Sequence, residues 1–284
     1  MPGTFVLREA EEAMDIRAFV QEHQCRRAVI GGGGLLGLEA GYALHKLGLA
    51  VSVLERGEWL LRRQLDARGS AFLRQYLEAL GIDIVVQAET DAALGDGRVR
   101  QVRLKDGRTL PCELLLVAVG ITPNVELART AGLQINRGVI VDVTMRTSAP
   151  DVFAAGDACE FERQVSGLWP VAIEQTRVAA VNAMGGQAAY RETVPVTTLK
   201  VVGIDITSIG QFDPRAEDEI VIALEDTNEH RYRKLVVAGG MIVGAILLGY
   251  PLYAPAVSAA IKNGVDVGND LDDLRAGRWE ILER

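Results

Sequence analysis

Residues 26–55 read RRAVIGGGGLLGLEAGYALHKLGLAVSVLE. The apolar run 28–31 predicts a short strand. The leucine- and alanine-rich run 35–47 predicts a helix that stops at Gly48, the usual glycine just past a helix end. A second apolar strand over 49–55 then ends in Glu55. A strand, a glycine-rich turn, a helix and a second strand in this order are typical of one half of a Rossmann-type nucleotide-binding fold.

The glycines after the first strand have the spacing G-x-G-x-x-G, in which each glycine has its own purpose. Gly32 is expected to make the tight turn, Gly34 to let the backbone approach a pyrophosphate, and Gly37 to let the helix pack closely on the sheet. The helix would then offer free N–H groups and its positive dipole end to the phosphates. The residues of this motif are Gly32, Gly33, Gly34, Leu35, Leu36 and Gly37. The alternative is a glycine-rich loop that only packs.

The acid at the end of the second strand bears on which nucleotide is bound. Glu55 lies 23 positions after Gly32, where a carboxylate is expected to accept the ribose hydroxyls of an adenine nucleotide. A carboxylate repels a 2′-phosphate, which favours NADH over NADPH. Arg56, Arg62 and Arg63 follow closely, and they leave NADPH open unless they form a solvated basic face.

The rest of the chain alternates between helical and strand patterns. Before residue 120 we expect helices over 9–23 and 65–80 and strands over 82–86, 99–104, from 109 onward and 114–119. Between 121 and 192 we expect helices over 125–131 and 171–184 and strands over 139–143 and 152–155. After residue 193 we expect strands over 199–209, 219–224, 232–237 and 241–248 and a helix over 255–263. The chain is thus predicted to be an α/β protein.

A second candidate site follows the predicted strand 152–155. Gly156 and Asp157 come directly after it, and the carboxyl ends of strands are where open α/β sheets bind ligands. On sequence alone this pair is equally well explained as an ordinary turn.

Composition excludes several classes of partner and site. The 284 residues carry a net charge of -8, which disfavours binding to nucleic acid or to anionic membranes. No apolar run approaches the ~20 residues of a membrane span, and the first residues lack the basic start of a signal peptide, so a cytoplasmic protein is expected. Cys25, Cys112 and Cys159 are too scattered for a disulfide framework or a metal site and are expected to be buried thiols.

Several stretches together give the chain a family resemblance. It resembles the flavoprotein reductases with two dinucleotide-binding domains, the pyridine nucleotide-disulfide oxidoreductase superfamily. Within that group it is most similar to the NADH:rubredoxin reductase and nitrite reductase large-subunit branch. The resemblance is carried by VIGGGGLLGLEAGYAL, ERGEWLLRRQLD, LLVAVGITPN, TSAPDVFAAGDA, LWPVAIEQTRVAAVNAMG and LKVVGIDITSIG, which occur in the family's order.

The resemblance implies a domain organisation. Residues 1–24 would be a linker and helix from the flavin domain, and 25–120 a Rossmann-type NAD(P)-binding domain. Residues 121–192 would be the C-terminal half of an FAD-binding domain, and 193–284 a small C-terminal α+β domain of the rubredoxin-reductase kind.

It also implies roles for individual residues. Glu39 would lie near the nicotinamide and flavin rings, Gly120 would line the same cleft, and Asp157 beside Gly156 would bind the ribityl and phosphate end of FAD. The remaining implied cofactor contacts are Glu174, Gln175 and Thr176, which would lie beside the flavin ring. For Glu39 and Glu174 the alternative is an ordinary glutamate on a helix surface. No side chain need act as an acid or base, since the cofactors carry the chemistry.

One feature of the family is absent from these residues. The sequence has a single G-x-G-x-x-G, whereas the family begins with another that holds the ADP part of FAD. We therefore expect that roughly a hundred residues, about one mononucleotide-binding half, precede this sequence in relatives. Flavin binding by this chain alone is then in doubt, and the exposed apolar surface left on 121–192 predicts self-association or a partner chain.

Two functions follow from the resemblance. The first is an oxidoreductase module that passes hydride from NAD(P)H, preferably NADH, to FAD and electrons on to a redox protein or reductase module. The second is an NAD(H)-binding subunit without its own flavin, inactive unless another chain supplies the front half. The acidic stretch 213–229 could steer a basic electron carrier, or it is a solvated hairpin.

Overall fold

The computed structural model describes residues 1–191 and 196–283. The chain forms two compact units, one of residues 1–119 with 194–284 and one of residues 120–193. We call them the first and the second unit and describe each by itself.

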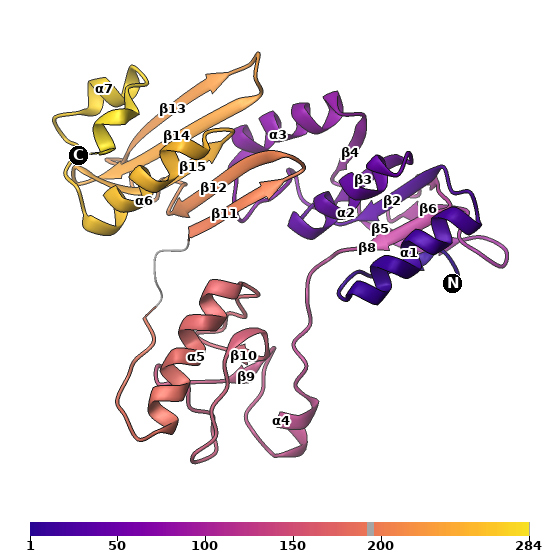
Figure 1. Cartoon of the computed structure of the whole chain (residues 1–284), viewed down its shortest axis with the longest axis horizontal. Coiled ribbons are helices and arrows are strands. Elements are labelled where there is room, and N and C mark those ends of the chain that lie inside the picture. The colour runs from indigo at the N-terminus through magenta and orange to yellow at the C-terminus, as the bar shows by residue number, and fades with distance from the viewer. Residues whose placement is uncertain (192–195, 284) are drawn as a thin grey trace. The chain divides into compact units, whose positions relative to one another are not determined.

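The first unit contains a parallel five-stranded sheet in the order β1-β8-β2-β3-β4 (Figure 1). Its strands are β1 (Thr4–Phe5), β2 (Arg27–Gly31), β3 (Ala50–Glu55), β4 (Ile82–Val86) and β8 (Leu114–Val117). Gly31 at the end of β2 pairs with Leu54 on one side and Val117 on the other. The carboxyl ends of three strands therefore meet where the glycine-rich turn begins.

Both faces of this sheet are covered, which explains why its strands are rich in apolar residues and why β8 is apolar throughout. One face packs against α1 (Ala10–Glu22), α2 (Leu35–Lys46) and α3 (Ala67–Ala79). The other packs against an antiparallel sheet of β5 (Thr90–Leu94), β6 (Gln101–Leu104) and β7 (Thr109–Pro111). Neighbouring residues of β2 point to opposite faces of the sheet. Ile30 faces the helices and Val29 faces the small sheet.

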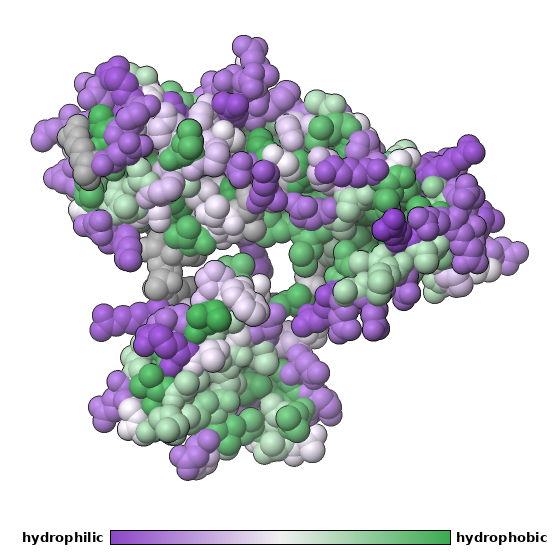
Figure 2. All heavy atoms as spheres, in the orientation of Figure 1, coloured by the Kyte–Doolittle hydropathy of each residue, from purple (hydrophilic) through white to green (hydrophobic). Residues whose placement is uncertain are grey.

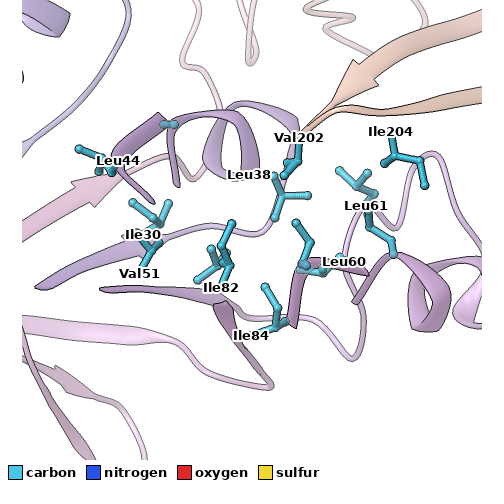
Figure 3. Close-up of a cluster of buried hydrophobic side chains, with 14 of the residues drawn as sticks. Ile30, Leu38, Leu44, Val51, Leu60, Leu61, Ile82, Ile84, Val202 and Ile204 are labelled. Atoms are coloured by element: carbon cyan, nitrogen blue, oxygen red, sulfur yellow. The ribbon is translucent and has the colours of Figure 1, made fainter. Parts of the chain in front are cut away.

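The C-terminal part of the first unit is an antiparallel sheet in the order β11-β12-β15-β14-β13. Its elements are β11 (Val196–Val201), β12 (Ile204–Gly210), β13 (Ile220–Asp226), β14 (Arg231–Ala238) and β15 (Met241–Leu248), followed by α6 (Ala254–Asn263) and α7 (Leu271–Arg275). One face buries Leu247 and its neighbours against α6 and α7. Side chains of the other face join the core of the parallel sheet, where Figure 3 shows Val202 and Ile204 beside Leu38 and Leu61.

The second unit is small. It contains α4 (Glu126–Thr130), a two-residue parallel pair of β9 (Val139–Ile140) and β10 (Cys159–Glu160), and α5 (Trp169–Ala183). Its core is formed by Val141, Met145, Cys159, Val178 and Tyr190. Large apolar side chains stay exposed, among them Trp169 at 79% and Met184 at 89%, and Figure 2 shows hydrophobic side chains over the surface of this unit.

The predicted α/β fold is confirmed, and several local details differ from the expectations. Residues 152–155 form no strand; only Phe153 makes a single bridge, to Arg146. The predicted strand 199–209 is two strands, because Val202 and Gly203 both have positive φ and turn the chain. Residues 90–94 form β5, which we did not predict.

The structure also bears on the start of the chain. Residues 1–24, expected as a linker from the flavin domain, lie in the first unit. Thr4 and Phe5 add a parallel strand beside β8, and Ile16 and Val20 of α1 are buried in its core. The predicted boundary between residues 192 and 193 falls among residues 192–195, outside the described residues.

Candidate functional site

The glycine-rich turn after β2 has a backbone that requires glycine at its first position. Gly32 has a φ of +123°, a region that side chains disfavour, and a Cβ there would lie 2.4 Å from the carbonyl oxygen of Ala118. The Gly32 N–H donates to the Leu54 carbonyl at 2.8 Å. This turn therefore holds the chain tightly between the ends of β3 and β8.

Gly37 and Gly34 differ in the space around them. A Cβ on Gly37 would lie 1.9 Å from the carbonyl oxygen of Gly32, so α2 approaches the turn as closely as a backbone can. A Cβ on Gly34 would meet nothing within 4 Å. Gly34, with open space around its Cβ position, is the N-cap of α2 and gives the first helix amides no side-chain cap. This arrangement suits a phosphate, which free helix amides and the helix dipole attract.

Glu55 holds the two loops that flank this space. One carboxylate oxygen accepts the N–H of Gly33 at 3.0 Å and the other accepts the N–H of Gly57 at 2.6 Å. Each oxygen keeps a further lone pair for a ligand hydroxyl. Of the two leucines in the motif, Leu35 is partly buried in the core and Leu36 is exposed on α2.

A cavity of about 490 Å³ lies at the ends of β3 and β4. It is lined by Arg56, Gly57, Glu58, Arg62, Gln87, Glu89, Lys105 and Asp106. Lys105 pairs with Glu89 at 2.7 Å, whereas Arg56 and Arg62 pair with no carboxylate among residues 1–191 and 196–283. Arg62 stacks over the Trp59 ring at 5.1 Å. Two guanidinium groups without acidic partners thus border the cavity beside Glu55.

Glu39 is on α2, two residues after Gly37. Its Oε1 accepts the backbone N–H of Val202 at 2.8 Å, and the Tyr76 hydroxyl donates to the Val202 carbonyl at 3.1 Å. The tip of the β11–β12 hairpin is thereby tied to α2 and α3. Glu39 is thus exposed on the surface of α2, and its carboxylate is engaged by the hairpin.

The other predicted residues lie in the second unit. Gly120 is its first residue, and its φ is +112°. Gly156 has a φ of +74° and donates its N–H to Oε1 of Gln175 at 2.9 Å, an atom that also accepts the Cys159 thiol at 3.2 Å. Gln175 is buried, so its side chain braces this turn from inside.

Unlike Gln175, the other three predicted residues are not buried; they are Asp157, Glu174 and Thr176. Asp157 is exposed in the turn after Gly156, and Thr176 is exposed on α5. Glu174 pairs with Arg177 at 2.6 Å. Asp157 and Thr176 thus remain accessible to a ligand of the second unit.

Glu160 in the second unit is a buried carboxylate that we did not single out. Oε1 accepts from Asn136 at 2.8 Å, while Oε2 accepts from the N–H groups of Arg137 and Gly138 at 2.7 and 2.9 Å. These hydrogen bonds lower the pKa of Glu160, and the bond from the Gly138 N–H has the largest effect. A single acid on the two-residue strand β10 gives no sequence signal, since its donors come from a loop more than twenty residues earlier.

Glu160 should make the second unit sensitive to acid. Its folded pKa is lowered, so its stabilisation is present above the pKa of an unfolded glutamate, about 4.3, and is lost as the pH falls through the folded pKa. We expect Glu160→Gln to destabilise the unit by about 2 kcal/mol at pH 7 and to flatten this pH dependence. Amide exchange of Gly138 between pH 3 and 7 measures both effects. An equally steep pH dependence in the glutamine variant would contradict the assignment.

The three cysteines are buried free thiols, as expected. Burial raises the pKa of Cys112 and of Cys159 to about 11, so neither is a reactive thiolate at neutral pH. Residues 1–191 and 196–283 contain no group of acids, histidines or cysteines that could hold a metal ion. In the same residues, no helix is both long and apolar enough to cross a bilayer.

Comparison with known proteins agrees with this geometry. The family described as "Pyridine nucleotide-disulphide oxidoreductase" matches residues 1–176, and the "Rubredoxin NAD+ reductase C-terminal domain" matches residues 195–265. A nitrite reductase (NAD(P)H) of Bacillus subtilis (strain 168) is 38% identical over 245 residues, which are 86% of this chain and 30% of that protein. The ferredoxin–NAD(+) reductase component of the biphenyl dioxygenase system of Paraburkholderia xenovorans (strain LB400) is 32% identical, over 96% of this chain and 69% of that one.

A solved structure shows the same fold. The NAD-dependent persulfide reductase from A. fulgidus superposes with a TM-score of 0.83 at 27% identity, over 94% of this chain and 54% of that chain. The present chain thus spans about a third of the nitrite reductase and about half of the persulfide reductase.

Proposed function

Because the chain belongs to the pyridine nucleotide-disulphide oxidoreductase family, whose members bind NAD(P)H and FAD, we propose that it is the NAD(P)H-binding part of an electron-transfer oxidoreductase. When bound, the nicotinamide coenzyme would supply a hydride and FAD would accept it, and the electrons would go on to a redox protein or a reductase module. The observation that carries the proposal is the open space around Gly34 at the uncapped N-terminus of α2, with Glu55 bonded to the adjacent Gly33.

Different residues of the first unit bind different parts of the coenzyme. The α2 amides and the backbone of residues 32–34 bind the pyrophosphate. Glu55 accepts the ribose hydroxyls, and the cavity beside it takes the adenosine. Glu39, held by Val202, stands further along α2, toward the nicotinamide end. When bound, the nicotinamide supplies a hydride and FAD the electron acceptor, so these residues bind and orient rather than transfer protons.

We propose the domain roles that the family resemblance implies. Residues 25–120 bind NAD(P)H, 121–192 supply one side of a flavin site, and 193–284 form the C-terminal domain. In the second unit, Gly120 and the Gly156 turn with Asp157 would line that site, together with Glu174 and Thr176 on α5. Gln175 acts indirectly, by bracing the turn.

A second candidate function is an NAD(H)-binding subunit whose flavin site is completed by another chain. A flavin pyrophosphate needs its own glycine turn and helix, and residues 1–284 contain only the one that serves the nicotinamide coenzyme. The exposed apolar side chains of the second unit favour this candidate, because patches of this kind mark interaction sites. Self-association through the same surface would also bury them.

Two measurements on the purified protein test the proposal. Fluorescence titration with NADH should show saturable binding under both candidates, and failure to bind would overturn the proposed function. The absorption spectrum separates the candidates, since bound flavin absorbs near ~450 nm and makes the protein yellow. A colourless protein that binds NADH would favour the subunit that needs a second chain.

Coenzyme preference should depend on Arg62. We expect the wild type to prefer NADH, because the Glu55 carboxylate repels a 2′-phosphate. Arg62→Ala should then weaken NADPH binding about tenfold and NADH binding only about twofold, since an arginine without an acidic partner pairs best with the extra phosphate. Arg63→Ala is the matched control, because Arg63 is exposed and does not line the cavity. Equal losses for both coenzymes would exclude a 2′-phosphate role for Arg62.

A further inference from the structure

A buried lysine of the C-terminal sheet reaches an acid of the nucleotide-binding part. Lys234 on β14 is only 5% exposed, and its Nζ lies 2.7 Å from Oδ2 of Asp66. Tyr232, two residues earlier on the same face of the strand, donates its hydroxyl to that oxygen at 3.0 Å. Asp213 adds a second, longer contact to the lysine at 3.3 Å. A buried ammonium is costly unless paired, so these contacts hold Asp66 firmly.

Asp66 in turn ends the loop that borders the cavity. Residues 56–66, which we call the 56–66 loop, begin at Arg56 beside Glu55 and end at Asp66, the N-cap of α3. Oδ1 of Asp66 accepts the N–H of Gly69 at 2.7 Å and leaves Oδ2 for Lys234 and Tyr232. A single side chain thus joins the end of the loop, the start of α3 and the C-terminal sheet.

The 56–66 loop is connected to the glycine turn by a short series of contacts. The Leu61 N–H donates to the Gly33 carbonyl at 3.4 Å, and the Leu60 N–H donates to Oγ of Ser70 at 2.9 Å. Leu60, Leu61 and Leu65 are buried, and Figure 3 shows Leu60 and Leu61 within the core. Arg62 projects from the same loop to the cavity. A shift of Asp66 would therefore be transmitted to Arg62 and Gly33.

We propose that Lys234 is a positioning residue for nucleotide binding: through Asp66 it sets the 56–66 loop that borders the adenosine end of the candidate site. The C-terminal sheet is then part of the nucleotide-binding apparatus, although Lys234 does not line the cavity. This inference rests on the proposed function, since it concerns the coenzyme that the function requires.

The test compares Lys234→Met with Lys234→Arg and with a matched control. Arg68→Met is the control, because Arg68 also joins the start of α3 to the C-terminal sheet, through Glu225 at 2.6 Å, but is exposed and lies outside the loop. We expect Lys234→Met to raise the Kd for NADH and for AMP about tenfold at a temperature well below unfolding. Lys234→Arg should recover most of this loss and Arg68→Met should show none. A purely structural role would lower the Tm without changing either Kd.

A milder variant keeps the inference falsifiable if Lys234→Met does not fold. Tyr232→Phe removes one bond to Asp66 and keeps the ring stacked on Phe72, and we expect about a threefold higher Kd for AMP. An unchanged Kd in Tyr232→Phe and in every folded Lys234 variant would overturn the positioning role. If the wild type itself binds neither NADH nor AMP, the proposed function fails instead.

Discussion

Replacing Gly34 with aspartate is expected to weaken NADH binding more than a hundredfold while leaving the Tm within about 2 °C of the wild type. Folding should tolerate the change because a Cβ at Gly34 meets nothing within 4 Å and its φ of −80° is open to any residue. Aspartate is also a favoured N-cap, so α2 itself should not suffer. Binding should fail because the new carboxylate occupies and repels the place of the pyrophosphate.

Fluorescence titration and thermal unfolding of the same samples check this expectation. Gly34→Asn is the matched control, since asparagine has nearly the same volume and caps a helix equally well but carries no charge. We expect it to fall between the wild type and the aspartate variant, which separates the contribution of charge from that of volume. Wild-type affinity in Gly34→Asp would show that no diphosphate binds at this helix end, and the proposed function would fall with it.

Gly37→Ala should have the opposite profile, with a large loss of stability. The added Cβ would lie 1.9 Å from the Gly32 carbonyl oxygen, and both sides of the clash are backbone, so neither can rotate away. Overpacking of this kind costs about 1–3 kcal/mol, partly offset by the better helix propensity of alanine. Because the contact is unusually short, we expect a net loss of about 2 kcal/mol and a Tm lower by about 4–8 °C.

Gly41→Ala, one turn later on α2, is the control for Gly37→Ala. Its Cβ would meet side chains of Ile30, Val51 and Val53 at 3.3–3.4 Å, and side chains can adjust. We expect a clearly smaller loss of Tm in this variant. Equal losses in the two alanine variants would mean that the approach of α2 to the glycine turn is not the limiting contact.

Local features of the chain were predictable because their causes are local. The left-handed backbone at Gly32 and the alternation of strand and helix periods over 26–55 depend only on neighbouring residues. The family resemblance, carried by several motifs in order, is confirmed by the match over residues 1–176. The strand expected over 152–155 was wrong, since an apolar run in a small unit need not find a neighbouring strand to pair with.

The sequence by itself therefore determined the glycine-rich turn, its order of strand, glycines, helix and acid, and the family. Only the tertiary structure decided what Glu39 and Asp66 contact, because their partners Val202, Tyr232 and Lys234 lie more than 160 residues away in the chain. A hydrogen bond over that separation depends on how two sheets pack, and no periodicity or spacing along the chain encodes it. The same holds for Gln175 and Glu160. Their buried side chains accept hydrogen bonds from the backbone of distant loops in the second unit.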